Sequence, residues 1–362
     1  MFRKLSAALV LLILITGCGE KVDLYDSTPP SMFAGESSRA DSSEKKEDSL
    51  FGDDYDKTEN PDNQGINIIP VDNGGAEISA GLQMPVSGFW RDSLSEQDKA
   101  SYDNIYNTLM SGNIDVKFDV KYTAEEIEHI YQCFSEDHPE IFWLTKGYLI
   151  TYDDTSSGLS LCFVNDIDSG NLAEYRTRFE EEAQNILSRL PQDASLYEQI
   201  LFIHDYIVRH TKYASDYVSI PYEDSHMYYS AYGCLVQHYC VCSGYTKAFQ
   251  YLMHEIGVPC GSVSGFATRN GEAHKWNYVK YEGEYYWIDV TWDDPVDYSG
   301  DPIDTSEVAH TYFFITTDEL LHNHVIGNKD TLGEDNLFVP ECTATEYNYM
   351  RHSGNYMESY SF

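Results

Sequence analysis

The chain has few basic side chains for its length. Among its 362 residues, 23 are Lys or Arg and 60 are Asp or Glu, so the formal net charge is −37 at pH 7. Such a surface repels the phosphates of nucleic acids and the headgroups of anionic lipids. The sequence therefore argues against nucleic-acid binding and against electrostatic docking on a membrane, and it favours a neutral or basic substrate.

Long apolar segments and metal-binding cysteine pairs are also missing. After the N-terminal 20 residues, no run is apolar and long enough to be a transmembrane helix, and we find no internal repeat. Cys240 and Cys242 lie close together with His238 nearby, but the Cys-x2–4-Cys spacing of zinc sites does not occur. We therefore predict neither a metal nor a cofactor.

The N-terminus has the pattern of an export signal. Arg3 and Lys4 precede an apolar run over 7–15, which is too short to span a bilayer as a helix. The run ends in Ile-Thr-Gly-Cys18, which resembles the cleavage box of bacterial lipoproteins. The resemblance implies a signal peptide over 1–17, lipid attachment to the thiol of Cys18, and anchoring to the cell membrane. An ordinary secretory signal is the alternative, and both place the mature chain outside the cytoplasm.

Residues 18–85 have the composition of a disordered acidic tether. Between positions 21 and 63, twelve Asp and Glu stand against five Lys and Arg, with many Ser, Asn and Pro. A segment with so few apolar residues does not bury enough surface to offset the entropy of ordering it. We expect it to separate the folded part of the chain from the membrane.

The next segment, 86–190, is predicted to form an N-terminal region of helices and one hairpin. Periodic apolar positions predict a helix from Ser95 to Gly112, and a capping box of Thr123 and Glu126 opens a second. Two strands and a long helix are predicted to follow, over 148–152, 159–164 and 171–190.

A second region is predicted over 191–325, followed by a C-terminal extension over 326–362. Ser195 and Glu198 cap its first helix. The remaining elements outside the motifs below are two strands and a short helix, predicted over 258–267, 312–315 and 317–324.

Cys242 opens a helix in this region. Up to Gly257, apolar residues recur with the stripe of an amphipathic helix, at 245, 248, 249, 252, 253 and 256. Gly257 and Pro259 end the helix. The Cys242 thiol therefore lies at a helix N-terminus, where free N–H groups and the macrodipole favour a thiolate. Cys240 is an alternative nucleophile, but it precedes the helix.

His274 and Asp289 lie on a predicted hairpin. Strand-like runs over 274–281 and 284–292 flank Glu282-Gly283, and a two-residue turn there places position 281 opposite 284. His274 and Asp289 are then diagonal neighbours on one face, within roughly 7–8 Å between backbones. We expect a hydrogen bond through which Asp289 orients the imidazole, as in nucleophile, base and orienter triads. A purely structural pair is the alternative.

These motifs resemble those of a known family. The stretch from Ala231 to Phe249, the run His274-Lys-Trp-Asn and the run Asp289-Val-Thr-Trp-Asp-Asp-Pro are similar, in order and spacing, to motifs of the bacterial transglutaminase-like superfamily. The resemblance covers about residues 195–320. It implies an α+β fold, in which a papain-like core packs the catalytic helix on an antiparallel sheet and carries an N-terminal α/β extension.

The resemblance also implies acyl transfer at amide bonds by a triad of Cys242, His274 and Asp289. The family includes proteases, amidases, cross-linking transglutaminases and catalytically dead scaffolds, so it does not fix the substrate. His238 departs from the family pattern, because it stands in the loop before the helix where Gly is common.

Several roles stay open at the level of sequence. The Cys242 backbone N–H is a candidate oxyanion donor, with Gln237 as a weak second candidate. With Cys18 lipidated and Cys242 free, six cysteines remain, and they could form three disulfides or stay reduced; they are Cys133, Cys162, Cys234, Cys240, Cys260 and Cys342. Four tyrosines before the helix could line a cleft or form an aromatic core, namely Tyr222, Tyr228, Tyr229 and Tyr232.

Together these features predict a lipid-anchored, extracytoplasmic thiol enzyme, with a cysteine protease or amidase as the leading activity. A cross-linking transglutaminase and a non-catalytic surface-binding module are the alternatives. The expected partners are a protein or peptide substrate, with the cell envelope as one source, and the membrane through the lipid anchor. No nucleic acid is expected.

Overall fold

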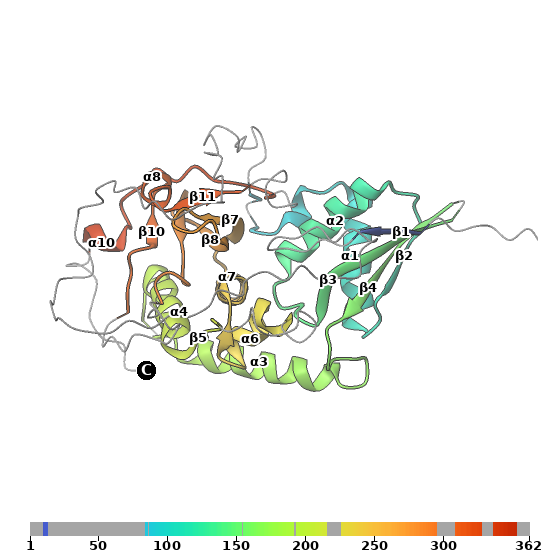
Figure 1. Cartoon of the computed structure of the whole chain (residues 1–362), viewed down its shortest axis with the longest axis horizontal. Coiled ribbons are helices and arrows are strands. Elements are labelled where there is room, and N and C mark those ends of the chain that lie inside the picture. Colours follow the sequence, from blue (N-terminus) through green and yellow to red (C-terminus); the bar gives the residue numbers. More distant parts are fainter. Residues whose placement is uncertain are drawn as a thin grey trace, which may run out of the picture. The chain divides into compact units, whose positions relative to one another are not determined.

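The computed structural model describes residues 10–13, 84–85, 87–153, 155–191, 193–215, 226–294, 308–327 and 336–352. Cys18, almost all of the predicted tether, Tyr222 and the last residues of the C-terminal extension lie outside the described residues. Figure 1 shows that the described residues contain two main sheets, each accompanied by helices.

The first sheet belongs to the N-terminal region and has the strand order β1-β3-β4-β2. Three of its strands are β2 (Asp115–Phe118), β3 (Leu144–Tyr152) and β4 (Ser157–Phe163). The accompanying helices are the short 3-10 helix η1 (Trp90–Ser93), α1 (Glu96–Met110) and α2 (Ala124–Asp137). Helix α1 contacts both α2 and β2, so the helices and the sheet share one core.

The fourth strand, β1 (Val10–Ile13), falls within the predicted signal peptide. It pairs antiparallel with β3, from Val10 opposite Thr151 to Ile13 opposite Tyr148. This strand was not among the predicted elements. Its Val and Ile residues have high β propensity, and the free edge of β3 offers unpaired backbone groups to an apolar segment of this kind.

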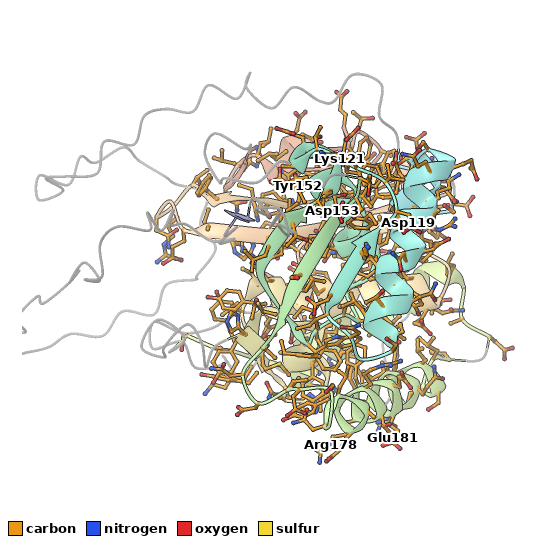
Figure 2. All side chains as sticks on the ribbon, turned by 90° about the vertical axis from the view of Figure 1, so that its right-hand side faces the viewer. Asp119, Lys121, Tyr152, Asp153, Arg178 and Glu181 are labelled. Carbon is orange, nitrogen blue, oxygen red and sulfur yellow. The ribbon has the colours of Figure 1, made fainter. Side chains whose placement is uncertain are left out.

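Local sequence signals correctly predicted the three α-helices of this region, α1, α2 and α3, whereas η1 and β2 were not predicted. The Thr123 hydroxyl accepts the Glu126 N–H at 3.2 Å, and the Glu126 carboxylate accepts the Thr123 N–H at 2.7 Å, which completes the capping box of α2. The long helix α3 (Leu172–Ser188) lies within its predicted range. Its exposed residues Arg178 and Glu181 point away from the sheet (Figure 2), while the opposite side of the helix is buried.

The second sheet has five antiparallel strands in the order β10-β9-β8-β7-β11. In chain order they are β7 (Cys260–Ala267), β8 (Ala273–Tyr281), β9 (Glu284–Ile288), β10 (Phe313–Ile315) and β11 (His324–Ile326). Helix α7 (Cys242–Glu255) packs against β7 and β8 and lies near the centre of Figure 1. This arrangement of a helix on an antiparallel sheet confirms the predicted α+β class.

Short elements surround the N-terminus of α7. Helix α4 (Leu196–His210) begins at the predicted capping box of Ser195 and Glu198 and packs against α7. The 3-10 helix η3 (His226–Tyr229) and helix α6 (Ala231–Leu235) also contact α7. Strand β5 (Lys212–Tyr213) pairs in parallel with β6 (Tyr239–Cys240), and β6 leads directly into α7.

The C-terminal elements differ from the prediction. The helix expected over 317–324 is α8 (Thr317–Leu320), and the chain then forms β11, which pairs with the edge of β7 from His324 opposite Ala267. Pairing with that edge gives the backbone of β11 the hydrogen bonds that a longer helix would otherwise supply. The last described element is α10 (Tyr349–His352). Within the described residues, no helix is long and apolar enough to cross a membrane.

Candidate active site

Cys242 is the first residue of α7 and follows Val241, whose extended backbone caps the helix without a side-chain hydrogen bond. The thiol is buried, with 4% of the residue exposed. The free N–H groups of the first turn and the helix dipole therefore act on the sulfur, as the sequence predicts. Gly257, in the left-handed region at φ +76°, follows the end of the helix.

The packing around Cys242 explains the glycine at position 244 and the left-handed backbone conformation at position 238. A Cβ on Gly244 would lie 2.5 Å from Cys240 Cβ and 2.8 Å from the Tyr228 carbonyl oxygen, so only glycine fits without a shift of the neighbours. His238 has φ 54°, a left-handed conformation that glycine adopts most easily. The backbone thus accounts for the glycine that is common in the family at this position.

The predicted hairpin and its register are confirmed. Tyr281 pairs with Glu284, and the ladder continues to Asn277 opposite Ile288. Glu282 and Gly283 have φ 51° and 87°, as a tight turn with two left-handed residues requires. The ladder ends one step before Asp289, so β9 (Glu284–Ile288) is shorter than the predicted strand over 284–292.

The hairpin brings His274 and Asp289 together, as expected. His274 Nε2 lies 2.7 Å from Asp289 Oδ2, and both residues are buried. The other carboxylate oxygen, Oδ1, accepts the backbone N–H groups of Thr291 at 3.1 Å and Trp292 at 3.2 Å. Asp289 is therefore held from both sides, and its hydrogen bond fixes which nitrogen of His274 faces the thiol.

A second histidine, His324, also binds Asp289 and was not identified from the sequence. Its Nε2 lies 3.0 Å from Asp289 Oδ2, the oxygen that His274 uses, and its Nδ1 lies 2.8 Å from Asn323 Oδ1. The ring packs against Trp292 with centroids 4.2 Å apart. His324 reaches this place through the pairing of β11 with β7, and the sequence carries no local signal for that pairing.

The charges of these groups stabilise a thiolate and an imidazolium. Burial acts to raise the pKa of the Cys242 thiol, but the hydrogen bond and charge of His274 and a backbone hydrogen bond from Lys275 lower it overall. Burial alone would lower the pKa of His274, but the charge and hydrogen bond of Asp289, with help from Cys242, raise it to about 10. Burial opposes ionisation of Asp289 as well, yet His274 and His324 hold its pKa well below the usual range.

Cys240 behaves in the opposite way. It is buried, and burial together with a hydrogen bond to Cys234 raises the pKa of its thiol well above the ordinary value. Among the described residues, Cys240 has no histidine partner that lowers its pKa in the way that His274 lowers that of Cys242. At a pH at which Cys242 ionises, Cys240 therefore stays protonated. Of the two cysteines considered from the sequence, the electrostatics favour Cys242. The remaining cysteines of the described residues are free thiols in this structure.

Two of the four tyrosines considered from the sequence, Tyr228 and Tyr232, pack against other aromatic rings. Tyr232 is buried against Phe142, with ring centroids 4.7 Å apart, and against Tyr175, at 5.5 Å. The ring of Tyr228 lies edge-on to that of Tyr239, at 5.3 Å. For these residues the contacts correspond to the aromatic-core alternative.

A second buried network, also not identified from the sequence, adjoins the site. His204 of α4 lies with Nδ1 2.9 Å from Asp205 Oδ1 and with Nε2 3.1 Å from Asp293 Oδ2. His310 Nε2 lies 2.7 Å from the same oxygen of Asp205. Burial would lower the pKa of His204, but Asp205 and Asp293 raise it to about 9, so the network is a charged link between α4 and the segment after Asp289.

Two groups of described residues bring metal-ligating atoms within 4.8 Å of one another: His274 with Asp289 and His324, and His204 with Asp205 and His310. In both groups the imidazole nitrogens face a shared carboxylate oxygen at 2.7–3.0 Å. Two ligands of one tetrahedral metal, each about 2.0–2.2 Å from the ion, would lie roughly 3.3–3.6 Å apart, so these shorter separations are those of hydrogen bonds. The arrangement therefore fits proton-sharing pairs.

A cleft adjoins the first turn of α7. It has a volume of about 400 Å³ and is lined by residues of α2, β3, α7, β7 and β8. Ser243, in the first turn of α7 beside Cys242, lines it. Lys275 also lines it, and the backbone of Lys275 forms a hydrogen bond with the Cys242 thiol, although the side chains of His274 and Lys275 point to opposite faces of β8. The cleft therefore lies close to the thiol.

Part of the chain matches a known protein family. Residues 183–291 match the model of the transglutaminase-like superfamily. This part of the chain is therefore a transglutaminase-like domain, and it contains Cys242, His274 and Asp289. No curated protein matches the chain.

Solved structures resemble this chain only weakly. A structure described as a TGase is 12% identical with a TM-score of 0.30, and the match covers 49% of this chain and 50% of that one. A Cytophaga hutchinsonii protein whose description proposes a cysteine protease is 14% identical, with a TM-score of 0.26 and coverage of 40% and 56%. The chain thus spans about half the length of these two proteins. At such TM-scores the likenesses carry no argument about activity.

Proposed function

We propose that the transglutaminase-like domain hydrolyses amide bonds of a protein or peptide, as a cysteine protease or amidase. The observation that carries the proposal is the pairing of Cys242 at the start of α7 with the buried His274–Asp289 hydrogen bond of 2.7 Å. A nucleophile, a base and an orienting carboxylate then occur together, in the order that covalent catalysis needs.

The first half-reaction forms a thioester. The Cys242 thiolate adds to the carbonyl carbon of the amide, and the oxygen takes the negative charge at the N-terminus of α7. The Cys242 backbone N–H is the proposed first donor to that oxygen. When the carbon–nitrogen bond breaks, the imidazolium of His274 donates its proton to the nitrogen, and the amine leaves. Asp289 keeps the imidazole oriented throughout.

The second half-reaction restores the thiolate. Neutral His274 takes a proton from water, and the resulting hydroxide adds to the thioester carbon. The carbon–sulfur bond breaks, the carboxylic acid leaves, and the proton on His274 pairs again with the Cys242 thiolate. An amine in place of water would give a cross-link. We favour water because the sequence specifies no amine-binding site.

The proposed location is the outer face of the cell membrane. The support is the sequence alone: the lipoprotein-like box at Cys18 and the acidic composition of 18–85. Mass spectrometry of the N-terminal peptide tests it directly. We expect a diacylglycerol-modified Cys18, and a Cys18→Ala variant should leave the membrane fraction. An unmodified N-terminus at residue 1 would contradict the proposal.

The activity is tested with the full-length protein and a defined peptide library in H₂¹⁸O. Hydrolysis should place one ¹⁸O atom in each new carboxyl group, whereas a labelled primary amine added to the mixture should not be incorporated. Cys242→Ala should abolish cleavage, and Cys240→Ala is the matched control because its thiol is buried two residues away. Incorporation of the amine without ¹⁸O would identify a transferase, and cleavage by Cys242→Ala would refute the proposed nucleophile.

A further inference from the structure

The cleft beside the first turn of α7 carries three lysines from three different elements. Lys146 belongs to β3, Lys247 to α7 and Lys275 to β8. All three are partly exposed. The cleft therefore gathers positive charge on a chain in which acidic residues outnumber basic ones by 60 to 23.

The acidic residues of the cleft offset this charge only in part. Glu128 and Glu136 also line it. Glu136 Oε1 is bound to β7, because it accepts the N–H of Ser262 at 2.8 Å and its hydroxyl at 2.5 Å. No described residue forms an ion pair with Lys275. Within the described residues, no carboxylate therefore neutralises the ammonium group of Lys275.

The net charge of the whole chain does not decide what enters the cleft. Exposed charges further away than about 8 Å are largely screened at physiological ionic strength. The lysines line the cleft itself, so a bound group experiences them at short range and with less water between. The local charge therefore outweighs the distant acidic surface, and the preference differs from the neutral or basic substrate that overall composition favours.

We propose that the cleft binds a carboxylate of the substrate, so that the enzyme acts on peptides with an acidic side chain or a C-terminal carboxylate near the cleaved amide. This inference rests on the proposed amide hydrolysis and names its substrate class. Lys275 binds the carboxylate, and its backbone hydrogen bond with the Cys242 thiol keeps it near the reacting groups. The positive charges of Lys247 and Lys146 in the same cleft add to the attraction. A volume of about 400 Å³ is enough for a short peptide segment.

The first test does not depend on finding a substrate. Cys242 of the full-length protein is alkylated with iodoacetate, which is anionic, and with iodoacetamide, which is neutral, and the ratio of the two rates is measured. Lys275→Met should lower this ratio about fivefold, the effect of one partly screened charge. Lys247→Met should lower it as well. High salt should bring the wild-type ratio towards that of the variants.

Lys280→Met is the matched control. Lys280 lies on the same strand, β8, but its ammonium group lies over the Tyr285 ring at 5.2 Å and it does not line the cleft. Its substitution should leave the ratio unchanged. If both Lys275→Met and Lys247→Met keep the wild-type ratio, the cleft does not attract anions and the proposal is overturned. Because the two lysines lie on different elements, misfolding of one variant leaves the other as a test.

The second test separates the substrate class from the reaction. Matched peptides carry Glu or Gln, Asp or Asn at each position, and end in a free carboxylate or an amide. At one position, or at the C-terminus, we expect the peptide with a carboxylate to have a kcat/KM about fivefold higher than its amide counterpart. This difference should be lost in Lys275→Met. Equal cleavage of all peptides would refute the carboxylate preference and leave amide hydrolysis standing. If no peptide is cleaved but the ratio of the iodoacetate and iodoacetamide rates still depends on Lys275, the proposed hydrolysis is refuted and the anion site stands.

Discussion

The reactivity of Cys242 tests the electrostatic description of the site most directly. At pH 6 a free thiol with a pKa of about 8.5 is only about 0.3% ionised. His274 and the backbone of Lys275 lower the pKa of Cys242, so its thiolate fraction at pH 6 is higher. Since the thiolate is the form that reacts, iodoacetamide should label Cys242 at least about tenfold faster than a model thiol at this pH.

The pH range of the ion pair follows from the signs of the two pKa changes. The thiolate forms above the lowered pKa of Cys242, and the imidazolium persists until the pH passes about 10, the raised pKa of His274. Between these limits both groups are charged and labelling is fast. His274→Ala removes the positive partner, so half-maximal labelling should move to higher pH.

Asp289→Asn should act through His274. Burial would lower the pKa of His274, but the charge and hydrogen bond of Asp289, with a further contribution from Cys242, raise it to about 10. An amide lacks the charge, so burial then favours the neutral ring and the thiolate loses its partner. Turnover should fall on the order of 10⁴-fold, as in other triads that lose this carboxylate.

Peptide mapping after brief labelling supplies the assay and its internal control. Cys240 lies two residues away, and its raised pKa should leave it unlabelled at pH 6. Label on Cys240 would mean that the nucleophile is wrongly assigned. If no cysteine reacts faster than a model thiol, the ion pair does not exist, and the non-catalytic alternative becomes the better interpretation.

Three further predictions concern parts of the structure away from the thiol. His324→Phe keeps a ring beside Trp292 but removes a donor to ionised Asp289, so kcat should fall about tenfold or more with KM little changed; unchanged kcat would make His324 a packing residue only. Asp137→Ala leaves the N–H groups of Trp90 and Arg91 without the carboxylate that accepts them at 2.6 and 2.8 Å, and should lower the free energy of unfolding by about 2–4 kcal/mol in a urea titration. Truncation before residue 84 should leave the melting temperature and thiol labelling unchanged, although it removes β1; a large fall in melting temperature would contradict the tether.

The sequence predicted those parts of the fold that local chemistry determines. The capping boxes at Thr123 and Ser195 satisfy backbone groups within one helical turn, so they are visible in any short window of sequence. The turn at Glu282-Gly283 likewise sets its own register, and the register placed His274 beside Asp289. A site built from one hairpin and one helix N-terminus can therefore be predicted from local sequence, before the overall fold is known.

The features that were not predicted depend on contacts between distant segments. His324 is 35 residues after Asp289, and it reaches the carboxylate only because β11 pairs with β7. The expected helix over 317–324 would have placed it differently. His204 lies 89 residues before Asp293. Neither pairing leaves a periodic pattern in the sequence, so the second donor to Asp289 required the three-dimensional arrangement.

The segment from Asp289 to Asp294 explains how the helix and the hairpin keep their relative position. Asp289 accepts hydrogen bonds from His274 and His324 of the sheet. Asp293 accepts one from His204 of α4, and Asp294 accepts one at 2.5 Å from the hydroxyl of Tyr245 on α7. Three carboxylates within six residues thus bind the sheet, α4 and α7.

Tyr245 lies within the first turn of α7, three residues after Cys242, so its bond to Asp294 restrains the rotation of the helix that carries the thiol. The same short segment therefore orients the imidazole through Asp289 and the nucleophile through Asp294. A displacement of this segment would change both sides of the Cys242–His274 pair together. The acidic run after β9 is accordingly a positioning element for the whole site, and orienting the histidine is one part of that role.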